Sequence, residues 1–340
     1  MSVTIKDIAK KAGVSPSTVS RVVNGNSIIS PETRERILEI MEQMNYHPNS
    51  LARKFANKST YTIALVIDAE DEKSFANTFF NRSVYAIEKV AFHKGYNLLI
   101  MNDNDHKNAS TNSLILEKQV DGLILPPSKI RKELIELLET EEFPYTVLGE
   151  SPLHRDTIRW VDIDNYGGSQ KAVDHLMAEG YRQTALIIEN ISNLFEKKRV
   201  EGYSYAIREC GTKSHREVLV EFGSDKEAFG EAIIGWIKKG VDSFICSNNI
   251  IAFELMKVLK RENIRIPEDI GIITFDNYPF AEYMDPPLSV IDINTYRLGE
   301  VAAEMLIEGI KNKETGSRQI LIDTDIIVRE SSIRGNKNDS

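Results

Sequence analysis

Short hydroxyl side chains and one arginine lie close together at residues 15–21. In order, the segment holds Ser15, Pro16, Ser17, Thr18, Ser20 and Arg21. A helix that enters the DNA major groove needs short side chains near its N-terminus, so that its backbone can approach the bases. Arginine then pairs with O6 and N7 of guanine. The segment is a candidate DNA-reading surface, although the solvent face of an ordinary three-helix bundle would have the same spacing.

A second set of polar residues follows apolar, strand-like runs. Asn248 comes shortly after the run that ends at Cys246, and Asp276 directly follows Phe275. Ligands of open α/β sheets bind at the carboxyl ends of the strands. Carboxylates and guanidinium groups make paired hydrogen bonds, which suits vicinal hydroxyls of a polyol. The alternative for each residue is a structural role, either as a helix cap or in a salt bridge between two parts of the body.

Motifs of enzymes and metal sites are missing from the sequence. It contains no G-x-G-x-x-G, G-x-x-x-x-G-K-[ST], H-E-x-x-H or G-x-S-x-G segment. The six histidines are scattered, and Cys210 and Cys246 form neither a zinc pattern nor a disulfide framework. We therefore expect no catalytic residues, no metal and no cofactor, although an α/β fold alone does not exclude an enzyme.

Charge is distributed unevenly along the 340 residues. Residues 1–60 hold nine Lys/Arg against five Asp/Glu, whereas the remainder holds 33 against 46. A small basic head on a large acidic body is consistent with binding of a polyanion. The length fits two or three domains. No run approaches the ~20 apolar residues of a membrane span, and the first residues lack the apolar core of a secretory signal, so we expect a cytoplasmic protein without a membrane partner.

The head is predicted to consist of three short helices. Apolar residues at 5, 8, 9 and 12 share one helical face, and Thr4 and Gly13 are suitable caps at its two ends. Ser15 can cap a second helix after a turn of only three residues, which is typical of a helix-turn-helix. Ser30-Pro31 begins a third helix, which ends before residue 45.

The body is predicted to alternate strands and helices. We expect strands at 62–68, 96–101, 122–125, 145–148, 184–188, 217–222, 242–246 and 270–275, with helices near 77–94, 109–119, 129–141, 166–178, 197–209, 226–238 and 249–262. Near-continuous apolar strands in such an order favour parallel sheets covered on both faces. Lys94-Gly95-Tyr96 and Glu179-Gly180-Tyr181 each close a helix and open a strand, as two similar lobes would.

The head closely resembles the lactose-repressor (LacI/GalR) family of bacterial transcription regulators. The residues that carry the resemblance are Thr4-Ile5-Lys6-Asp7-Ile8-Ala9, Ala12-Gly13-Val14-Ser15, Thr18-Val19-Ser20-Arg21-Val22-Val23-Asn24 and Tyr46-His47-Pro48-Asn49 with Ala52-Arg53. A looser resemblance continues to about Arg329. It implies an α/β fold with a helix-turn-helix head and a two-lobed body like that of periplasmic binding proteins, built on parallel sheets.

The resemblance also implies domain limits and DNA contacts. The head would span 1–48, a hinge helix and linker 49–60, and an effector-binding and dimerisation domain 61–332, with lobe one at about 61–161 and 292–320 and lobe two at about 162–291 and 321–332. The hinge helix of the family orders on DNA and wedges an apolar side chain, usually leucine, into the minor groove. Phe55 stands at that position here. DNA contacts would come from Thr4, Ser15, Pro16, Ser17, Thr18, Arg21, Asn24, Asn49, Ala52, Arg53 and Phe55.

The effector residues implied by the resemblance are Phe80, Asp164, Arg199, Asn248 and Asp276. Arg199 matches the arginine of the family's cleft, and an aromatic residue at 80 could stack on a ring. The family commonly has Asn-Asp where this chain has Asn248-Asn249, which questions any charge-dependent role at Asn249. Segments such as Val147-Leu148-Gly149-Glu150 resemble the maltose-operon repressors of Gram-positive bacteria.

The sequence thus predicts a repressor of carbohydrate-utilisation genes. Its partners would be a pseudo-palindromic double-stranded DNA operator, a sugar effector of the maltose or maltodextrin class, and a second copy of the chain in a homodimer. Two alternatives remain at this point. One is a solute-binding protein without a DNA role, and the other is a family member that responds to a purine or a phosphoprotein.

Overall fold

The computed structural model describes residues 3–23, 29–46, 59–67, 78–103, 109–151, 153–210, 216–313 and 316–334. They belong to two compact units, Met1–Tyr61 and Thr62–Ser340, which we call the head and the body. Every described helix is too short or too polar to cross a bilayer.

The head contains the three predicted helices, α1 (Ile5–Ala12), α2 (Pro16–Val23) and α3 (Pro31–Gln43). Their apolar faces meet in one core of Ile8, Ala9, Ala12, Val19, Val22, Ile37 and Met41. Gly13 ends α1 with a φ of 66°, in the left-handed region that glycine tolerates. The Ser15 hydroxyl accepts a hydrogen bond from the Thr18 N–H at 3.2 Å, so the predicted tight helix-turn-helix is confirmed.

The first lobe of the body is built on a six-stranded sheet in the order β11-β5-β4-β3-β1-β2. Its strands are β1 (Thr62–Ile67), β2 (Asn97–Asn102), β3 (Gly122–Leu125), β4 (Tyr145–Leu148), β5 (Arg159–Ile163) and β11 (Arg318–Ile322). All of their pairings are parallel. The helices of this lobe are α6 (Thr78–His93), α7 (Ala109–Leu116), α8 (Lys132–Thr140) and α13 (Thr295–Asn312), with the short 3₁₀ turn η1 (Pro127–Lys129).

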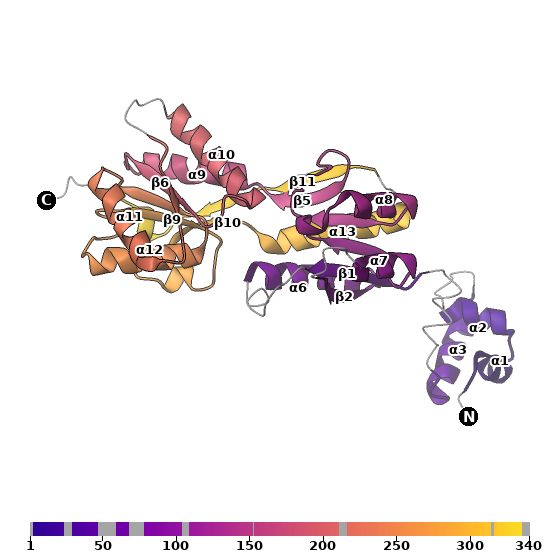
Figure 1. Cartoon of the computed structure of the whole chain (residues 1–340). Helices are drawn as coiled ribbons and strands as arrows, with labels where there is room; N and C mark the ends of the chain where they lie inside the picture. The colour runs from indigo at the N-terminus through magenta and orange to yellow at the C-terminus, as the bar shows by residue number, and fades with distance from the viewer. Residues whose placement is uncertain are drawn as a thin grey trace. The chain divides into compact units, whose positions relative to one another are not determined.

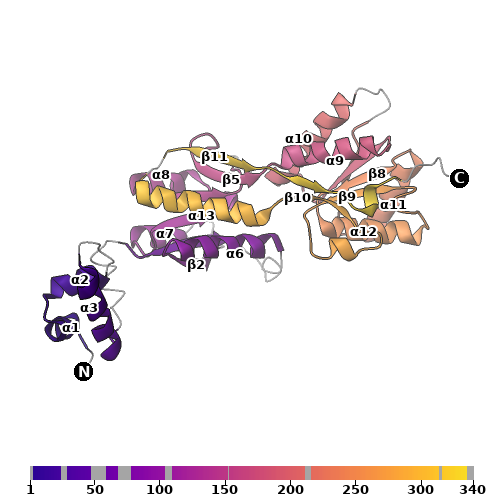
Figure 2. The same ribbon diagram turned by 180° about the vertical axis from the view of Figure 1, so that it is seen from behind.

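The second lobe repeats this plan with the order β12-β10-β9-β8-β6-β7 (Figures 1 and 2). Its strands are β6 (Thr184–Ile188), β7 (Leu219–Glu221), β8 (Ser243–Cys246), β9 (Gly271–Phe275), β10 (Ser289–Asp292) and β12 (Asp325–Ile327). Its helices are α9 (Asn165–Ala178), α10 (Leu194–Glu209), α11 (Lys226–Lys238) and α12 (Asn249–Arg261), with the 3₁₀ turns η2 (Ala281–Tyr283) and η3 (Glu330–Ser332).

The sheets are parallel, as predicted, except at one edge, where β12 pairs with β10 in the antiparallel direction. β12 follows β11 after only two residues, and so short a link from the other sheet leaves no room for a helical crossover. The sequence pattern also gave no separate prediction for β5, β10, α13, β11 or β12.

Alternating side chains of each strand enter different cores, as the two-residue period of a strand requires. In β1, Ile63, Leu65 and Ile67 belong to a core that also includes α6 and α13, whereas Ala64 and Val66 face α7 and α8. Strand β6 divides its side chains in the same way between the α9–α10 side and the α11–α12 side. Both sheets are therefore covered on both faces, as predicted.

The two lobes share a helix ending as well as a sheet plan. Gly95 after α6 and Gly180 after α9 have φ values of 83° and 84°. In both places the N–H of the following tyrosine donates back to the helix, from Tyr96 to Ala91 O at 2.8 Å and from Tyr181 to Leu176 O at 3.1 Å. This agreement confirms that the Gly-Tyr pairs mark corresponding points of two similar lobes.

The route of the chain brings the carboxyl ends of the strands into the region where the lobes meet. The chain passes from the first sheet to the second after β5, returns after β10, and crosses again between β11 and β12. One apolar core contains side chains of both sheets, including Ile163, Ile291 and Ile322. Residues at these crossings are therefore held between two rigid sheets.

Close packing of α13 against α6 gives a stability prediction. A Cβ on Gly299 of α13 would lie 2.3 Å from the backbone oxygen of Ser83 in α6. We expect Gly299→Ala to destabilise the body by about 1–3 kcal/mol, because the helices must separate to admit the methyl group. Gly235→Ala in α11 is the matched control, because nothing lies within 4 Å of that position. It should raise stability by about 0.5–1 kcal/mol. Urea unfolding of the body measures both, and equal midpoints for the two variants would contradict the packing argument.

Candidate functional site

Arg199 is a buried cation at the carboxyl edge of the second sheet. It lies in the second turn of α10 and is 6% exposed. Its Nε donates to Asn165 Oδ1 at 2.8 Å, and its Nη1 donates to the carbonyl oxygen of Ser247, directly after β8. The guanidinium carbon lies 3.9 Å from the ring centroid of Phe275. Contacts to α9, β8 and β9 thus fix the orientation of this side chain.

Three carboxyl groups surround the guanidinium closely enough for their charges to act on it: Glu196, Asp276 and Asp162. Burial lowers the pKa of Arg199 to about 10, an effect that these carboxyls oppose. Arg199 therefore remains charged at neutral pH. Burial in turn raises the pKa of all three carboxyls, and the charge of Arg199 works against that rise. We call these four residues together with Asn165 the Arg199 cluster.

Asp276 presents a carboxylate without a hydrogen-bond partner among the described residues. Its backbone has a φ of 80°, in the left-handed region that few residues other than glycine adopt. The backbone is held there by its own N–H, which donates to Ile291 O at 2.9 Å, and by Asn249 Nδ2, which donates to Asp276 O at 2.9 Å. The charge of Arg82, on α6 of the first lobe, also acts on Asp276. The open carboxylate therefore lies between the lobes.

Arg199 has an open position of the same kind. Its Nη2 donates to no acceptor in the part of the chain that the structure describes, whereas Nε and Nη1 are both paired. An open donor edge and an open carboxylate at the ends of neighbouring elements can together hold a ligand that offers both an acceptor and a hydroxyl or N–H donor.

The other predicted effector residues have structural partners. Asp164 is the N-cap of α9, and its Oδ1 accepts the Gly167 N–H at 2.8 Å. Asn248 is the N-cap of α12, where its Oδ1 accepts the Ile251 N–H at 2.9 Å, while its Nδ2 donates to Glu189 at 3.2 Å. Phe80 is half-buried on α6 and packs against the core shared by the lobes. The side chain of Phe79 lies outside the described residues.

Several residues of the site were not predicted from the sequence to belong to it. Glu196 lies one helical turn before Arg199, a spacing that could have indicated it. Asn249 explains the departure from the family's Asn-Asp pair, because its amide donates to the backbone oxygens of Phe275 and Asp276 and a carboxylate cannot donate. Asn165 and Ser247 contact Arg199 across distant parts of the sequence, and no local pattern predicts such contacts.

The predicted DNA-reading residues of α2 lie on the surface of the head. Ser15, Pro16, Ser17 and Arg21 are exposed, and Thr18 is half-buried. The Ser15 hydroxyl is hydrogen-bonded to the hydroxyls of Ser17 at 2.7 Å and Thr18 at 2.9 Å. Thr4 precedes α1 and its N–H donates to the Asp7 carboxylate at 2.9 Å. The remaining predicted contacts, Asn24, Asn49, Ala52, Arg53 and Phe55, lie outside the described residues.

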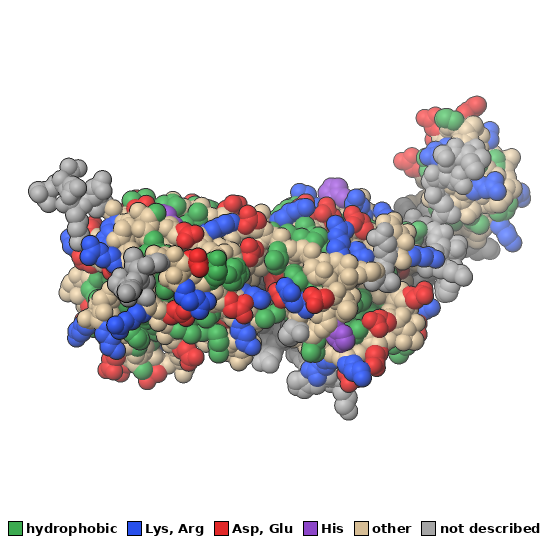
Figure 3. All heavy atoms as spheres, turned by 90° about the horizontal axis from the view of Figure 1, so that it is seen from above, with side chains coloured by type: hydrophobic (Ala, Val, Ile, Leu, Met, Phe, Trp, Pro, Cys, Tyr) green, Lys and Arg blue, Asp and Glu red, His purple; other side chains and the backbone are tan. Residues whose placement is uncertain are grey.

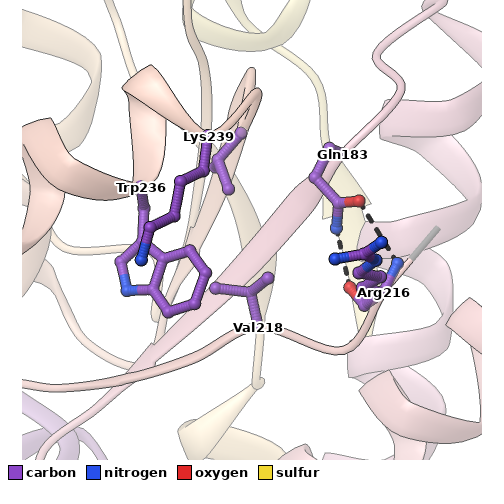
Figure 4. Close-up of a pocket in the computed structure, with 6 residues that line it drawn as sticks. Gln183, Arg216, Val218, Trp236 and Lys239 are labelled. Carbon is purple, nitrogen blue, oxygen red and sulfur yellow. Dashed lines mark hydrogen bonds between the residues drawn. The ribbon is translucent and has the colours of Figure 1, made fainter. Parts of the chain in front are cut away.

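A surface pocket of the second lobe is distant from the Arg199 cluster. It is lined by Gln183, Arg216, Val218, Trp236, Lys239 and Val241, at the amino ends of β6, β7 and β8 (Figure 4). The Gln183 amide is fully used there by the backbone of Arg216. None of the sequence-predicted residues lines it. Within the described ranges, no three His, Cys, Asp or Glu side chains are grouped so that they could hold a metal ion.

The cap geometry of Asp164 can be tested by two substitutions. Asp164→Ala removes the acceptor of the Gly167 N–H and should cost about 1 kcal/mol of body stability. Asp164→Asn keeps an equivalent cap and should leave the urea midpoint unchanged. If both variants unfold at the wild-type midpoint, the cap does not stabilise α9.

Comparison with known proteins finds a matching family model for the head and another for the body. A model of the lacI family of bacterial regulatory proteins matches residues 4–49, and a model of periplasmic binding protein-like domains matches residues 173–332. The HTH-type transcriptional repressor PurR of Vibrio cholerae serotype O1 (strain M66-2) is 30% identical over 335 residues, which cover 96% of this chain and 97% of that protein.

Solved structures share the architecture over almost the whole chain. One is a transcriptional regulator CelR–cellobiose complex, with 25% identity, a TM-score of 0.68, and coverage of 97% of this chain and 99% of the other. Another is the lac repressor dimer bound to operator and the anti-inducer ONPF, with 22% identity, a TM-score of 0.76, and coverage of 98% and 100%. These relatives are regulators and not enzymes. The chain belongs to the lacI family and is a DNA-binding transcriptional repressor.

Proposed function

We propose that this repressor controls carbohydrate-utilisation genes in the cytoplasm and responds to a sugar of the maltose or maltodextrin class, bound at the Arg199 cluster. The observation that carries the proposal is the pair of open groups, the Arg199 Nη2 and the Asp276 carboxylate. A carboxylate accepts from a sugar hydroxyl, and a guanidinium donates to a hydroxyl or ring oxygen. The regulator in the cellobiose complex, which is similar along the whole chain, supports a sugar as the ligand class.

Neighbouring residues would complete the binding of a sugar ring. Phe80 is the proposed stacking partner, and Asn248 would add an amide beside its capping role. Asp164 would act by fixing the start of α9, next to Asn165, which holds Arg199. In this arrangement the second lobe provides the charged contacts and α6 of the first lobe provides an aromatic one. A ligand that touches both lobes favours one arrangement of the lobes over another.

A purine is the second candidate for the effector. The relatives named PurR are similar over nearly the whole chain, and their name favours this class. A purine base presents ring nitrogens and oxo groups that Arg199 can also bind. A comparison of maltose with hypoxanthine, each titrated into the protein by calorimetry, separates the two candidates. If hypoxanthine binds and maltose does not, the effector is a purine and the sugar proposal is wrong.

The solute-binding alternative without a DNA role is excluded, because the head matches the family's DNA-binding domain.

We propose that α2 enters the major groove through Ser15, Pro16, Ser17, Thr18 and Arg21. Pro16 has no donor, so it can read a base only by apolar contact, for instance with a thymine methyl. Thr4, Asn24, Asn49, Ala52 and Arg53 are proposed to contact the DNA, and Phe55 is proposed as the minor-groove wedge.

Exposed apolar side chains on both lobes support a homodimer. The first lobe exposes Tyr85, Phe92, Leu99, Ile100 and Leu116, and the second exposes Ile250, Phe280 and Tyr283. Strand β2 is also an edge of the first sheet. On the face of the body shown in Figure 3, hydrophobic patches lie among interspersed charges of both signs. A two-fold dimer would cover such side chains and would place two heads on a pseudo-palindromic operator.

The first prediction of this proposal concerns base reading by Arg21. Arg21→Ala should weaken operator binding by roughly 1–3 kcal/mol and relax discrimination at one base position, because a bidentate contact to guanine is lost. Arg36→Ala removes the same charge from the exposed side of α3 and is the control. Gel shifts on operator and on random duplex measure both. Equal loss in the two variants, without a change in discrimination, would reduce Arg21 to a general phosphate contact.

The second prediction concerns the effector pair. Asp276→Asn removes the acceptor charge and Arg199→Lys removes the planar donor edge, so each should abolish the effect of maltose on operator binding. Operator affinity without effector should stay at the wild-type value, because neither residue belongs to the head. An effector shifts an equilibrium only through its different affinities for the two states. Wild-type maltose affinity in both variants, measured by calorimetry, would exclude these residues from the site.

A further inference from the structure

Glu196 is a buried carboxyl that the proposed ligand contacts do not use. It is 1% exposed and lies on α10, one turn before Arg199. Its Oε1 accepts the Ser247 hydroxyl at 2.9 Å and the Glu189 N–H at 3.3 Å. Glu189 directly follows β6 and Ser247 directly follows β8. The carboxyl thus bridges the carboxyl ends of two neighbouring strands, the edge to which Arg199 is also bound.

The second oxygen of this carboxyl lacks a hydrogen-bond partner among the described residues. Glu196 Oε2 is fully buried there and accepts no hydrogen bond from them. Burying an unpaired carboxylate oxygen is unfavourable unless a nearby cation compensates its charge. Arg199 is that cation, because its charge favours the ionised form of Glu196 while burial opposes it. Hydrogen bonds thus stabilise Oε1 only, and the charge of the carboxylate is compensated by the nearby guanidinium of Arg199.

Acidic groups outnumber basic groups around Arg199. Glu196, Asp276 and Asp162 all act on one guanidinium. Glu189 lies beside Glu196 and adds a further acidic group. The other cation that acts on Asp276 is Arg82, on the first lobe. An anion placed against the open Nη2 of Arg199 would be repelled by the same carboxyls whose charges act on the guanidinium, and burial of the site strengthens that repulsion.

We propose that Glu196 sets the charge selectivity of the site, so that the effector is an uncharged ligand and phosphorylated or carboxylated ligands are excluded. The proposal rests on the function proposed above, because it refines the ligand class of the same site. Glu196 acts through Arg199 and is a specificity-determining residue that does not touch the ligand. Its negative charge offsets the positive charge of the guanidinium, so Arg199 remains a hydrogen-bond donor but does not attract an anion.

The test uses inorganic phosphate as the probe and needs no knowledge of the natural effector. Glu196→Gln retains the size of the side chain and an oxygen for Ser247 and Glu189, but it removes the charge. We expect this variant to bind phosphate at least tenfold more tightly than the wild type, measured by calorimetry on the full chain. The gain should disappear in the double variant Glu196→Gln/Arg199→Gln, because no cation then remains at position 199 to attract phosphate.

Glu201→Gln is the matched control. It removes the same charge from the same helix at an exposed position, where Glu201 pairs with Lys198 at 3.2 Å. It should bind phosphate as weakly as the wild type. An equal gain in Glu196→Gln and Glu201→Gln would show a general effect of net charge and overturn the proposal. A gain that persists in the double variant would place the anion elsewhere and overturn it too.

Two further measurements keep the proposal separable from the proposed function. Glucose and glucose 6-phosphate are titrated into the wild type and into Arg199→Gln. If the wild type binds the phosphate ester more tightly than glucose, and Arg199→Gln loses that difference, the proposal is overturned even if Glu196→Gln does not fold. Maltose is titrated in parallel. Absence of maltose binding together with the expected gain of phosphate binding would refute the sugar class and leave the role of Glu196 intact.

Discussion

The burial of one guanidinium group constrains the whole body of this repressor. Arg199 is removed from water on α10, and a buried cation requires hydrogen bonds and opposite charge. The chain meets this requirement from several distant segments: Asn165 at the first crossing, Ser247 after β8, Phe275 at the end of β9, Asp276 directly after it, and Glu196 on the same helix. Each of these residues sits where its element ends or where the chain changes lobes. A shift of any element would expose or unpair the charge, so the cluster ties the second sheet to the crossings.

The same constraint accounts for local features that otherwise look like defects. Asp276 occupies a left-handed backbone conformation, and Asn249 holds it there through the backbone oxygen. Among the described residues, Glu196 Oε2 and Asn249 Oδ1 are buried without a hydrogen-bond partner. Unpaired buried groups and strained backbone occur at functional sites, where the surroundings hold them in place. These two oxygens and the strained Asp276 lie around the two open groups that we assign to the effector.

The head and the lobe plan could be predicted from the sequence because their signals are local. Gly13, Ser15 and Ser30 are helix boundaries that depend on nearby backbone groups, and the structure has them where expected. The return of residues 292–320 to lobe one was expected, but no secondary structure was predicted for helix α13 or for strands β10 and β11. The partners of Arg199 could not be found in the same way. Asn165 lies 34 residues before it and Ser247 lies 48 after it, and only the sheet order brings them together. Asp164 and Asn248 show a different limit of the sequence: a polar residue at a strand end can also cap the next helix, as both do here, so their role toward an effector stays a prediction.

The central claim is that the Arg199 cluster binds an effector whose affinity is coupled to DNA binding. The most direct measurement is calorimetry of maltose binding to the protein alone and to its complex with operator DNA. The account predicts two different dissociation constants, with a ratio of about 5–150 as is typical of allosteric coupling. By thermodynamic linkage, operator affinity measured with and without saturating maltose must change by the same ratio. Equal maltose affinity in the free and DNA-bound states would contradict the account.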